Sequence, residues 1–168
     1  MTRRINKMKF LNTLIVVSNM QKSKQFYYEV LGLEVVVDMG TNVTLTGGIA
    51  LQTKDTWAKF IRKRDREIVF GGNVAELYFE EDDFDCFIQR LNDIENMNYV
   101  HNVIEHSWGQ RVIRFYDPDQ HIIEVGENMT MVVKRFIDSG LSIEDTAIRM
   151  DVPVEYVKSC LESLKDRN

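Results

Sequence analysis

The stretch RFYDPDQHIIEVGE places a carboxylate, Glu124, inside an apolar run with the alternation of a β-strand. Ile122 and Glu124 share one face of that strand. A second carboxylate, Glu76, lies in the alternating run NVAELYFE, on the face opposite the apolar residues. Arg114 alternates in the same way in the run QRVIRFY. A sheltered carboxylate can move a proton or hold a cation, so these residues are the first candidates for chemistry.

Strands and helices follow the same order in both halves of the sequence. Residues 10–17 read as a strand, Ser18 can cap the next helix, and Gly32 ends it before three short strands. NVAELYFE, the amphipathic run DDFDCFIQRLNDI and three further strands repeat this order. The apolar stripe of that second helix leaves Cys86 as an expected small buried residue. The sequence therefore predicts two β-α-β-β-β modules.

Two segments together resemble the vicinal oxygen chelate superfamily, also called the glyoxalase/bleomycin-resistance/dioxygenase superfamily. They are FLNTLIVVSNMQKSKQFYYEVLGLEVV in the first module, and AELYFEEDDFDCFIQRL with WGQRVIRFYDPDQHIIEVGE in the second. The resemblance implies an α+β fold in which paired βαβββ modules form a curved eight-stranded mixed sheet. This cup-like domain would span residues 8–129, with modules at about 8–53 and 72–129 and a connector at 54–71. Residues 130–168 would be a helical extension.

The resemblance also implies which residues face the cup. The metal-ligand positions of the family fall on Asn12, Gln52, Glu76 and Glu124, and the two glutamates would also be the catalytic residues. None of the four positions holds a histidine, so the set offers only oxygen atoms. Such a site suits a divalent ion of the magnesium or manganese kind better than zinc, and no other cofactor is expected.

Two carboxylates in one sheltered site need a compensating partner. Glu76 and Glu124 could share a divalent cation, share a proton, or be neutralised by Arg114. Trp108 and Tyr78 would then provide aromatic walls for a ligand. The alternative assignments are an exposed pair of glutamates, a surface arginine and a tryptophan in the core. His101, His106 and His121 lie outside the ligand pattern, and we do not expect them to bind metal.

Composition limits the functional classes. The 168 residues carry a formal net charge of −5, which disfavours non-specific binding to nucleic acid or to an anionic membrane. The basic start MTRRINKMKF leads only into LIVV, which is too short for a signal-peptide core or a membrane span. Two widely separated cysteines indicate a reducing compartment without disulfides. We therefore expect a cytoplasmic protein.

The C-terminal extension holds three short helical patterns, MVVKRFIDSG, LSIEDTAIRM and DVPVEYVKSCLESLKD. Their arrangement is similar to a helix-turn-helix motif. The extension, however, has six basic and seven acidic side chains, which gives it a net charge of −1. Its third helix has no arginine before its extreme end, so a packing, lid or dimer-contact role is favoured over DNA binding. Its predicted small core consists of Ile143, Ala147, Ile148, Val152, Val157 and Leu161.

Two functions follow from the resemblance. The first is a divalent-metal-dependent lyase or isomerase of the glyoxalase type, acting on a small molecule in the cup. The second is a non-catalytic binder that sequesters a small molecule without metal, which the missing histidines favour. A third hypothesis makes the cup a ligand sensor for the helix-turn-helix-like extension. Family members are often homodimers, so the resemblance implies that state as well.

Overall fold

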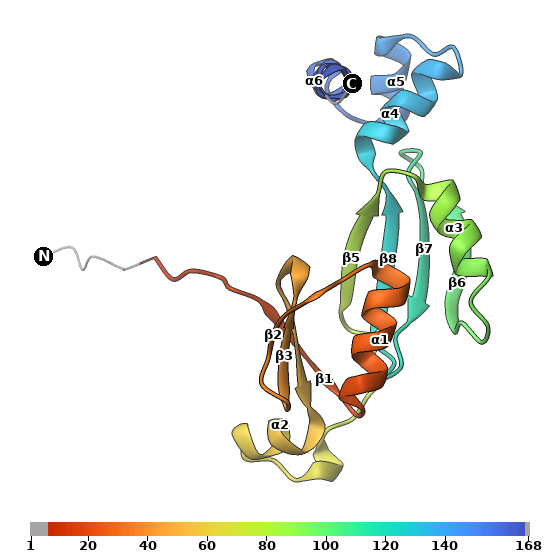
Figure 1. The fold of residues 1–168 in the computed structure, drawn as a ribbon. Helices are drawn as coiled ribbons and strands as arrows, with labels where there is room; N and C mark the ends of the chain where they lie inside the picture. Colours follow the sequence, from red (N-terminus) through yellow and green to blue (C-terminus); the bar gives the residue numbers. More distant parts are fainter. Residues whose placement is uncertain (1–6, 167–168) are drawn as a thin grey trace, which may run out of the picture. The chain divides into compact units, whose positions relative to one another are not determined.

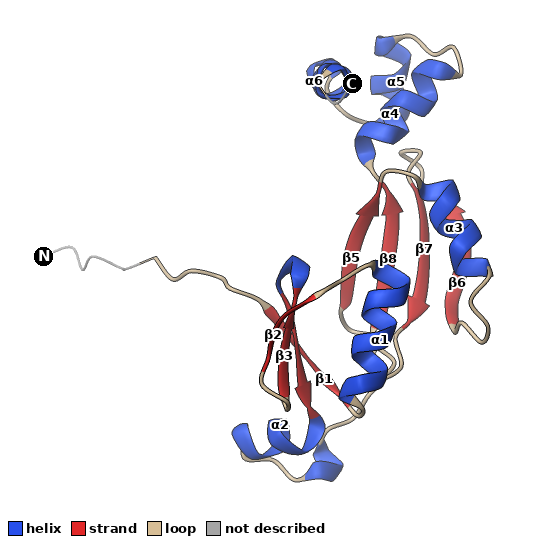
Figure 2. Cartoon of the chain, viewed as in Figure 1, coloured by secondary structure: helices blue, strands red, loops and turns tan. Residues whose placement is uncertain are grey.

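The chain forms two compact units that divide after Gly71 in a computed structural model that describes residues 7–166. Each unit contains one four-stranded mixed sheet with the expected β-α-β-β-β order (Figures 1 and 2). The predicted α+β class and the paired modules are therefore confirmed. Between residues 7 and 166, no helix is long and apolar enough to cross a membrane.

The sheet of the first unit has the strand order β1-β4-β3-β2. β1 and β4 are parallel, and the other neighbours are antiparallel. Its elements are β1 (Thr13–Val17), α1 (Met20–Leu31), β2 (Val35–Asp38), β3 (Asn42–Leu45), a 3-10 turn (Thr46–Gly48), β4 (Ile49–Thr53), α2 (Lys54–Phe60) and a second 3-10 turn (Asp65–Glu67).

Local chemistry sets the bounds of α1. The Asn19 side chain accepts a hydrogen bond from the Lys22 amide at 3.0 Å, and Gly32 ends the helix with a φ of 68°. The helix cap is therefore Asn19 rather than the predicted Ser18. β1 starts at Thr13, so the predicted start at Phe10 was too early.

The second unit repeats this topology with the strand order β5-β8-β7-β6. β8 lies between a parallel neighbour, β5, and an antiparallel neighbour, β7. Its elements are β5 (Glu76–Glu81), α3 (Phe84–Asn92), β6 (Tyr99–Glu105), β7 (Arg111–Tyr116), β8 (Ile122–Glu127), α4 (Met129–Asp138), α5 (Ile143–Met150) and α6 (Val154–Lys165).

α3 covers one face of this sheet (Figure 1). Asp83 caps the helix by accepting from the Cys86 amide at 3.1 Å, and Phe84, Phe87 and Leu91 are buried. Cys86 itself is exposed, so its predicted burial was wrong. Cys86 lies one position outside the apolar stripe of α3, on the side of the helix that faces solvent.

The three helices α4, α5 and α6 form the predicted extension and belong to the second unit. They share a small core of their own, made of Val132, Val133, Phe136, Ala147, Met150, Val157 and Cys160. Ala147 and Val157 were correctly assigned to it, and Ile143, Val152 and Leu161 pack against it. Ile148 was assigned wrongly, because its side chain is 78% exposed.

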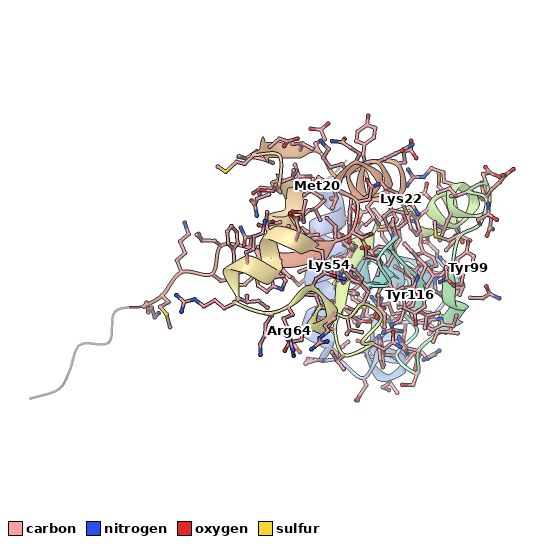
Figure 3. The ribbon with its side chains drawn as sticks, turned by 90° about the horizontal axis from the view of Figure 1, so that it is seen from below. Met20, Lys22, Lys54, Arg64, Tyr99 and Tyr116 are labelled. Atoms are coloured by element: carbon pink, nitrogen blue, oxygen red, sulfur yellow. The ribbon has the colours of Figure 1, made fainter. Side chains whose placement is uncertain are left out.

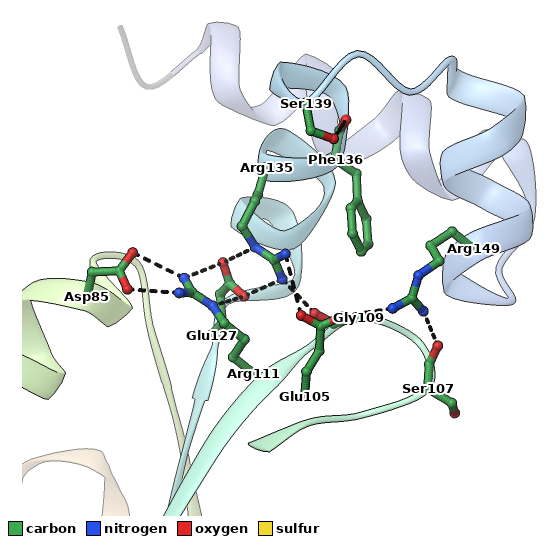
Figure 4. A network of polar contacts seen from close by, with 10 residues as sticks. All are labelled: Asp85, Glu105, Ser107, Gly109, Arg111, Glu127, Arg135, Phe136, Ser139 and Arg149. Carbon is green, nitrogen blue, oxygen red and sulfur yellow. Dashed lines mark hydrogen bonds and ion pairs between the residues drawn. The ribbon is translucent and has the colours of Figure 1, made fainter. Parts of the chain in front are cut away.

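Arginine side chains attach this extension to the end of the sheet (Figure 4). Glu127, the last residue of β8, is buried and accepts hydrogen bonds from Arg111 on β7 and Arg135 on α4, at 2.9–3.1 Å. Arg111 also reaches Asp85 on α3. Arg149 of α5 pairs with Glu105 at 2.8 Å, as drawn in the same network. The extension is therefore fixed to the second unit by charge-assisted hydrogen bonds.

Glu127→Gln should destabilise the second unit by about 2–3 kcal/mol at neutral pH, because two arginines lose a shared buried carboxylate. Burial raises the pKa of Glu127, but the hydrogen bonds and charges of Arg135 and Arg111 outweigh it and leave the pKa lowered. The contribution of ionised Glu127 to the free energy of unfolding is therefore complete above the unfolded-state pKa of about 4.3. It is lost as the pH falls through the pKa of Glu127 in the folded protein. Urea unfolding of both proteins at several pH values measures the difference.

The matched control is Glu105→Gln, which removes a carboxylate at the same junction that is far more exposed than Glu127. We expect only a small stability change for that variant. A Glu127→Gln deficit that stayed constant down to pH 3 would show that the buried carboxylate is not the anchor.

Candidate functional site

Three of the predicted site residues meet on the sheet face of the second unit that lies opposite α3. Strand pairing sets Arg114 of β7 beside Glu124 of β8. The Arg114 Nε donates to Glu76 Oε2 at 2.9 Å, and its Nη2 forms an ion pair with Glu124 Oε2. Glu124 is buried, whereas Glu76 is partly exposed. One guanidinium thus bridges both carboxylates, which was one of the three arrangements expected from the sequence.

His101 of β6 completes this cluster. Its Nε2 lies 3.3 Å from Arg114 Nη1, and its Nδ1 lies 2.7 Å from the Asn102 carbonyl oxygen. An arginine can only donate, so Nε2 accepts and Nδ1 carries the proton. The His101 ring therefore takes up a further N–H group of Arg114.

The two glutamates are not equivalent. The hydrogen bond from Arg114 lowers the pKa of Glu76, against the opposing effect of burial. Burial raises the pKa of Glu124 by more than the charge of Arg114 lowers it, and a hydrogen bond with Glu76 adds to the rise. When the pair holds one proton, Glu124 keeps it and Glu76 remains ionised.

Tyr78 lies next to this cluster, because it pairs with Glu124 across β5 and β8. Its hydroxyl donates to Glu80 at 3.0 Å and accepts from the Gln110 side chain at 2.9 Å. Burial raises the pKa of Tyr78 to about 12, so the hydroxyl stays protonated. The other oxygen of Glu80 accepts from Asn128, the cap of α4, at 3.0 Å. A chain of hydrogen bonds therefore runs from the polar face to the start of the extension.

Trp108 lies in the turn between β6 and β7 instead of on the strands that carry the cluster. Its ring stacks on His106 at a centroid distance of 4.3 Å, and its Nε1 donates to Gln110 at 3.3 Å. Tyr116, labelled in Figure 3, stands two residues after Arg114 in β7 and so points to the face of the cluster, and its hydroxyl donates to Asn73 at 3.0 Å. Gln110 therefore links Trp108 to Tyr78 by hydrogen bonds.

Asn12 and Gln52 belong to the first unit. Asn12 is exposed and precedes β1. Gln52 is buried in β4, where its amide oxygen accepts from Asn42 at 2.8 Å and its amide nitrogen donates to Thr56. Both polar ends of Gln52 are thus engaged inside its own unit, and the ligand roles of these two residues remain predictions.

The donor set of the second unit does not fit a divalent metal ion. Both carboxylates, Glu76 and Glu124, already bind the guanidinium of Arg114, and a cation placed between them would meet that charge. Within residues 7–166, no three His, Cys, Asp or Glu side chains come together in a way that could hold a metal. We therefore derive no metal-dependent step for this face.

The comparison with known families agrees with this architecture. The family described as Glyoxalase-like domain matches residues 10–130. The chain belongs to this family. Its match covers both modules and stops at the start of α4, so the glyoxalase-like domain includes the cluster and leaves out the helical extension. The membership also confirms the vicinal oxygen chelate superfamily predicted from the sequence.

Solved structures show the same fold. A protein of unknown function from Agrobacterium tumefaciens str. C58 is 33% identical, with a TM-score of 0.65 over 76% of this chain and 99% of that one. A glyoxalase/bleomycin resistance protein/dioxygenase from Nocardioides is 16% identical, with a TM-score of 0.61 over 74% and 86%. A lactoylglutathione lyase from Agrobacterium tumefaciens is 21% identical, with a TM-score of 0.56 over 74% and 96%. No curated protein matches the chain.

Sequence reasoning missed the roles of His101, Gln110 and Glu127. His101 shares the face of Arg114, but two register shifts in β6 hide this from simple alternation. Glu127 could have been found, because it stands three residues after Glu124 and so points to the opposite face. A glutamate on the helix-covered face of a central strand signals a buried ion pair.

Arg114→Gln should unmask the repulsion between the two carboxylates. Loss of the arginine raises the pKa of Glu124 in the folded protein further. A carboxyl whose pKa is higher in the folded than in the unfolded protein lowers the free energy of unfolding once the pH rises above the unfolded-state pKa of about 4.3. We expect a deficit of about 2 kcal/mol at pH 8 that shrinks near pH 4.5. Chemical denaturation of variant and parent protein at both pH values measures it.

The double variant Arg114→Gln/Glu124→Gln should recover most of this stability at pH 8, because no second carboxylate remains to repel Glu76. An Arg114→Gln deficit that did not depend on pH, or a double variant less stable than the single one, would contradict this account of the cluster.

Proposed function

We propose that the protein is a metal-independent small-molecule binding member of the glyoxalase-like family. The observation that carries this proposal is the Arg114 guanidinium, which bridges Glu76 and Glu124 where a metal ion would need their oxygens. A binding function needs only a polar recognition face, and the Glu76–Arg114–Glu124 cluster supplies one. Folded sheet strands hold all three side chains, so little ordering is needed when a ligand binds.

The charge of this face indicates the ligand class. Its carboxylates outnumber its arginines, because Glu76, Glu80 and Glu124 share this face with Arg114. Arg114 is already engaged by two carboxylates, so it is poorly placed to receive an anion. The partly exposed carboxylate of Glu76 and the exposed aromatic ring of Tyr78 suit a ligand that carries ammonium or amidinium groups.

Calorimetric titration tests this with compounds of similar size that differ in charge, a polyamine such as spermidine and a tricarboxylate such as citrate, both with chelator present. We expect the cation to bind and the anion not to. Glu76→Gln should weaken cation binding about tenfold, the loss of one charge-assisted hydrogen bond. Glu95→Gln, an exposed change on the loop after α3, is the matched control.

Preference for the anion, or full affinity in Glu76→Gln, would refute this ligand class. The competing hypothesis is a metal-dependent lyase, which needs Arg114 to release both carboxylates. Metal analysis of protein purified without a chelator or a histidine tag discriminates between the two. A stoichiometric divalent ion, lost in Glu124→Gln, would support the lyase and overturn the binder.

A further inference from the structure

The C-terminal end of α5 carries an exposed apolar side chain between two surface hollows. Ile148 lines both of them. One hollow, of about 640 Å³, lies against the turn into α6 and is also lined by Val152 and Val154. The other, of about 480 Å³, lies against the β6–β7 turn and is also lined by Trp108. Ile148, Val152, Val154 and Trp108 together place several apolar side chains around these two hollows, and a group of this kind with a polar border is typical of a contact surface.

The free charges around Ile148 are negative. Glu144 and Asp151 line the first hollow, and within residues 7–166 neither of them forms an ion pair with a basic side chain. Arg149 lines the second hollow, but its guanidinium is engaged by Glu105 and by the Ser107 carbonyl oxygen. The surface therefore combines an apolar centre with an acidic rim.

This surface is held in place by the rest of the second unit. The Val152 amide donates to the Ala147 carbonyl oxygen at 3.0 Å, and Asp151 ends α5 with a φ of 55°. Arg149 fixes the same end of α5 to the β6–β7 turn (Figure 4). A preformed surface binds with a smaller entropic cost than a loop that must first become ordered.

The charges decide among the classes of partner. Nucleic acid and anionic membranes would meet the carboxylates of Glu144 and Asp151. A second copy docked by two-fold symmetry would bring the same acidic rim against itself. A protein segment with apolar side chains flanked by lysine or arginine matches both the centre and the rim.

We propose that the surface around Ile148, made of Ile148, Trp108, Val152, Val154, Glu144 and Asp151, docks a basic amphipathic segment of another protein. The extension would then recruit a protein partner to the glyoxalase-like domain. This role is independent of the ligand class on the sheet face, because it uses none of the residues of the Glu76–Arg114–Glu124 cluster.

Trp108 provides a local reporter for the test. Trp57→Phe in the full chain leaves Trp108 as the single tryptophan. The probe is a 15-residue amphipathic peptide of leucine and lysine, compared with the same peptide in which glutamate replaces lysine. We expect the lysine peptide to change Trp108 fluorescence in a saturable way and the glutamate peptide to leave it unchanged.

Matched variants separate docking from general attraction to an acidic protein. Ile148→Ser should weaken binding of the lysine peptide at least tenfold. The double variant Glu144→Gln/Asp151→Asn should weaken it to the same extent. Val74→Ser, another exposed apolar residue, and Glu29→Gln with Glu95→Gln, two exposed acids elsewhere, should change affinity less than twofold. Circular dichroism checks that every variant is folded.

Equal affinity in the Ile148 variant and the controls, or no Trp108 response, would overturn the proposal. Sedimentation that showed a dimer lost on Ile148→Ser would assign the surface to a second copy. Duplex DNA binding that was lost in the same variant would assign it to nucleic acid. Either result would also refute the protein-partner proposal.

Discussion

Strand β8 buries two carboxylates, and the second unit is organised around the arginines that neutralise them. Glu124 points to the open face of the sheet and Glu127 to the face that α3 covers. A buried carboxylate without a partner is too costly to keep, so each requires a cation within reach. The neighbouring strand β7 supplies one to each face, Arg114 and Arg111, three residues apart like the two glutamates.

This alternation separates two tasks on one pair of strands. On the open face, Arg114 is shared between a buried and a partly exposed carboxylate, and the exposed one remains accessible to a ligand. On the covered face, Arg111 and Arg135 enclose Glu127 and fix α4 to the sheet. The same ion-pair chemistry therefore leaves a partly exposed polar cluster on one face and attaches a helix on the other.

The sequence predicts the architecture well, because it depends on local periodicity. Alternation alone puts Arg114 and Glu124 on one face, and strand pairing confirms it. The role of His101 could not be predicted, since bulges in β6 break the period that such reasoning needs. Ile148 and Cys86 show a second limit of sequence prediction. An apolar residue beside the apolar stripe of a helix is predicted to be buried, but its burial depends on which elements pack against it.

The distribution of basic residues explains why the extension does not resemble a nucleic-acid reader, despite its arrangement of helices. Arg135 is engaged by Glu127, and Arg149 by Glu105. These two arginines are therefore directed to the sheet that carries the candidate site. The acids Glu144 and Asp151 stay at the surface beside an exposed isoleucine. Attachment to the glyoxalase-like domain thus leaves acidic groups on this outer surface, and the proposed basic partner would complement them.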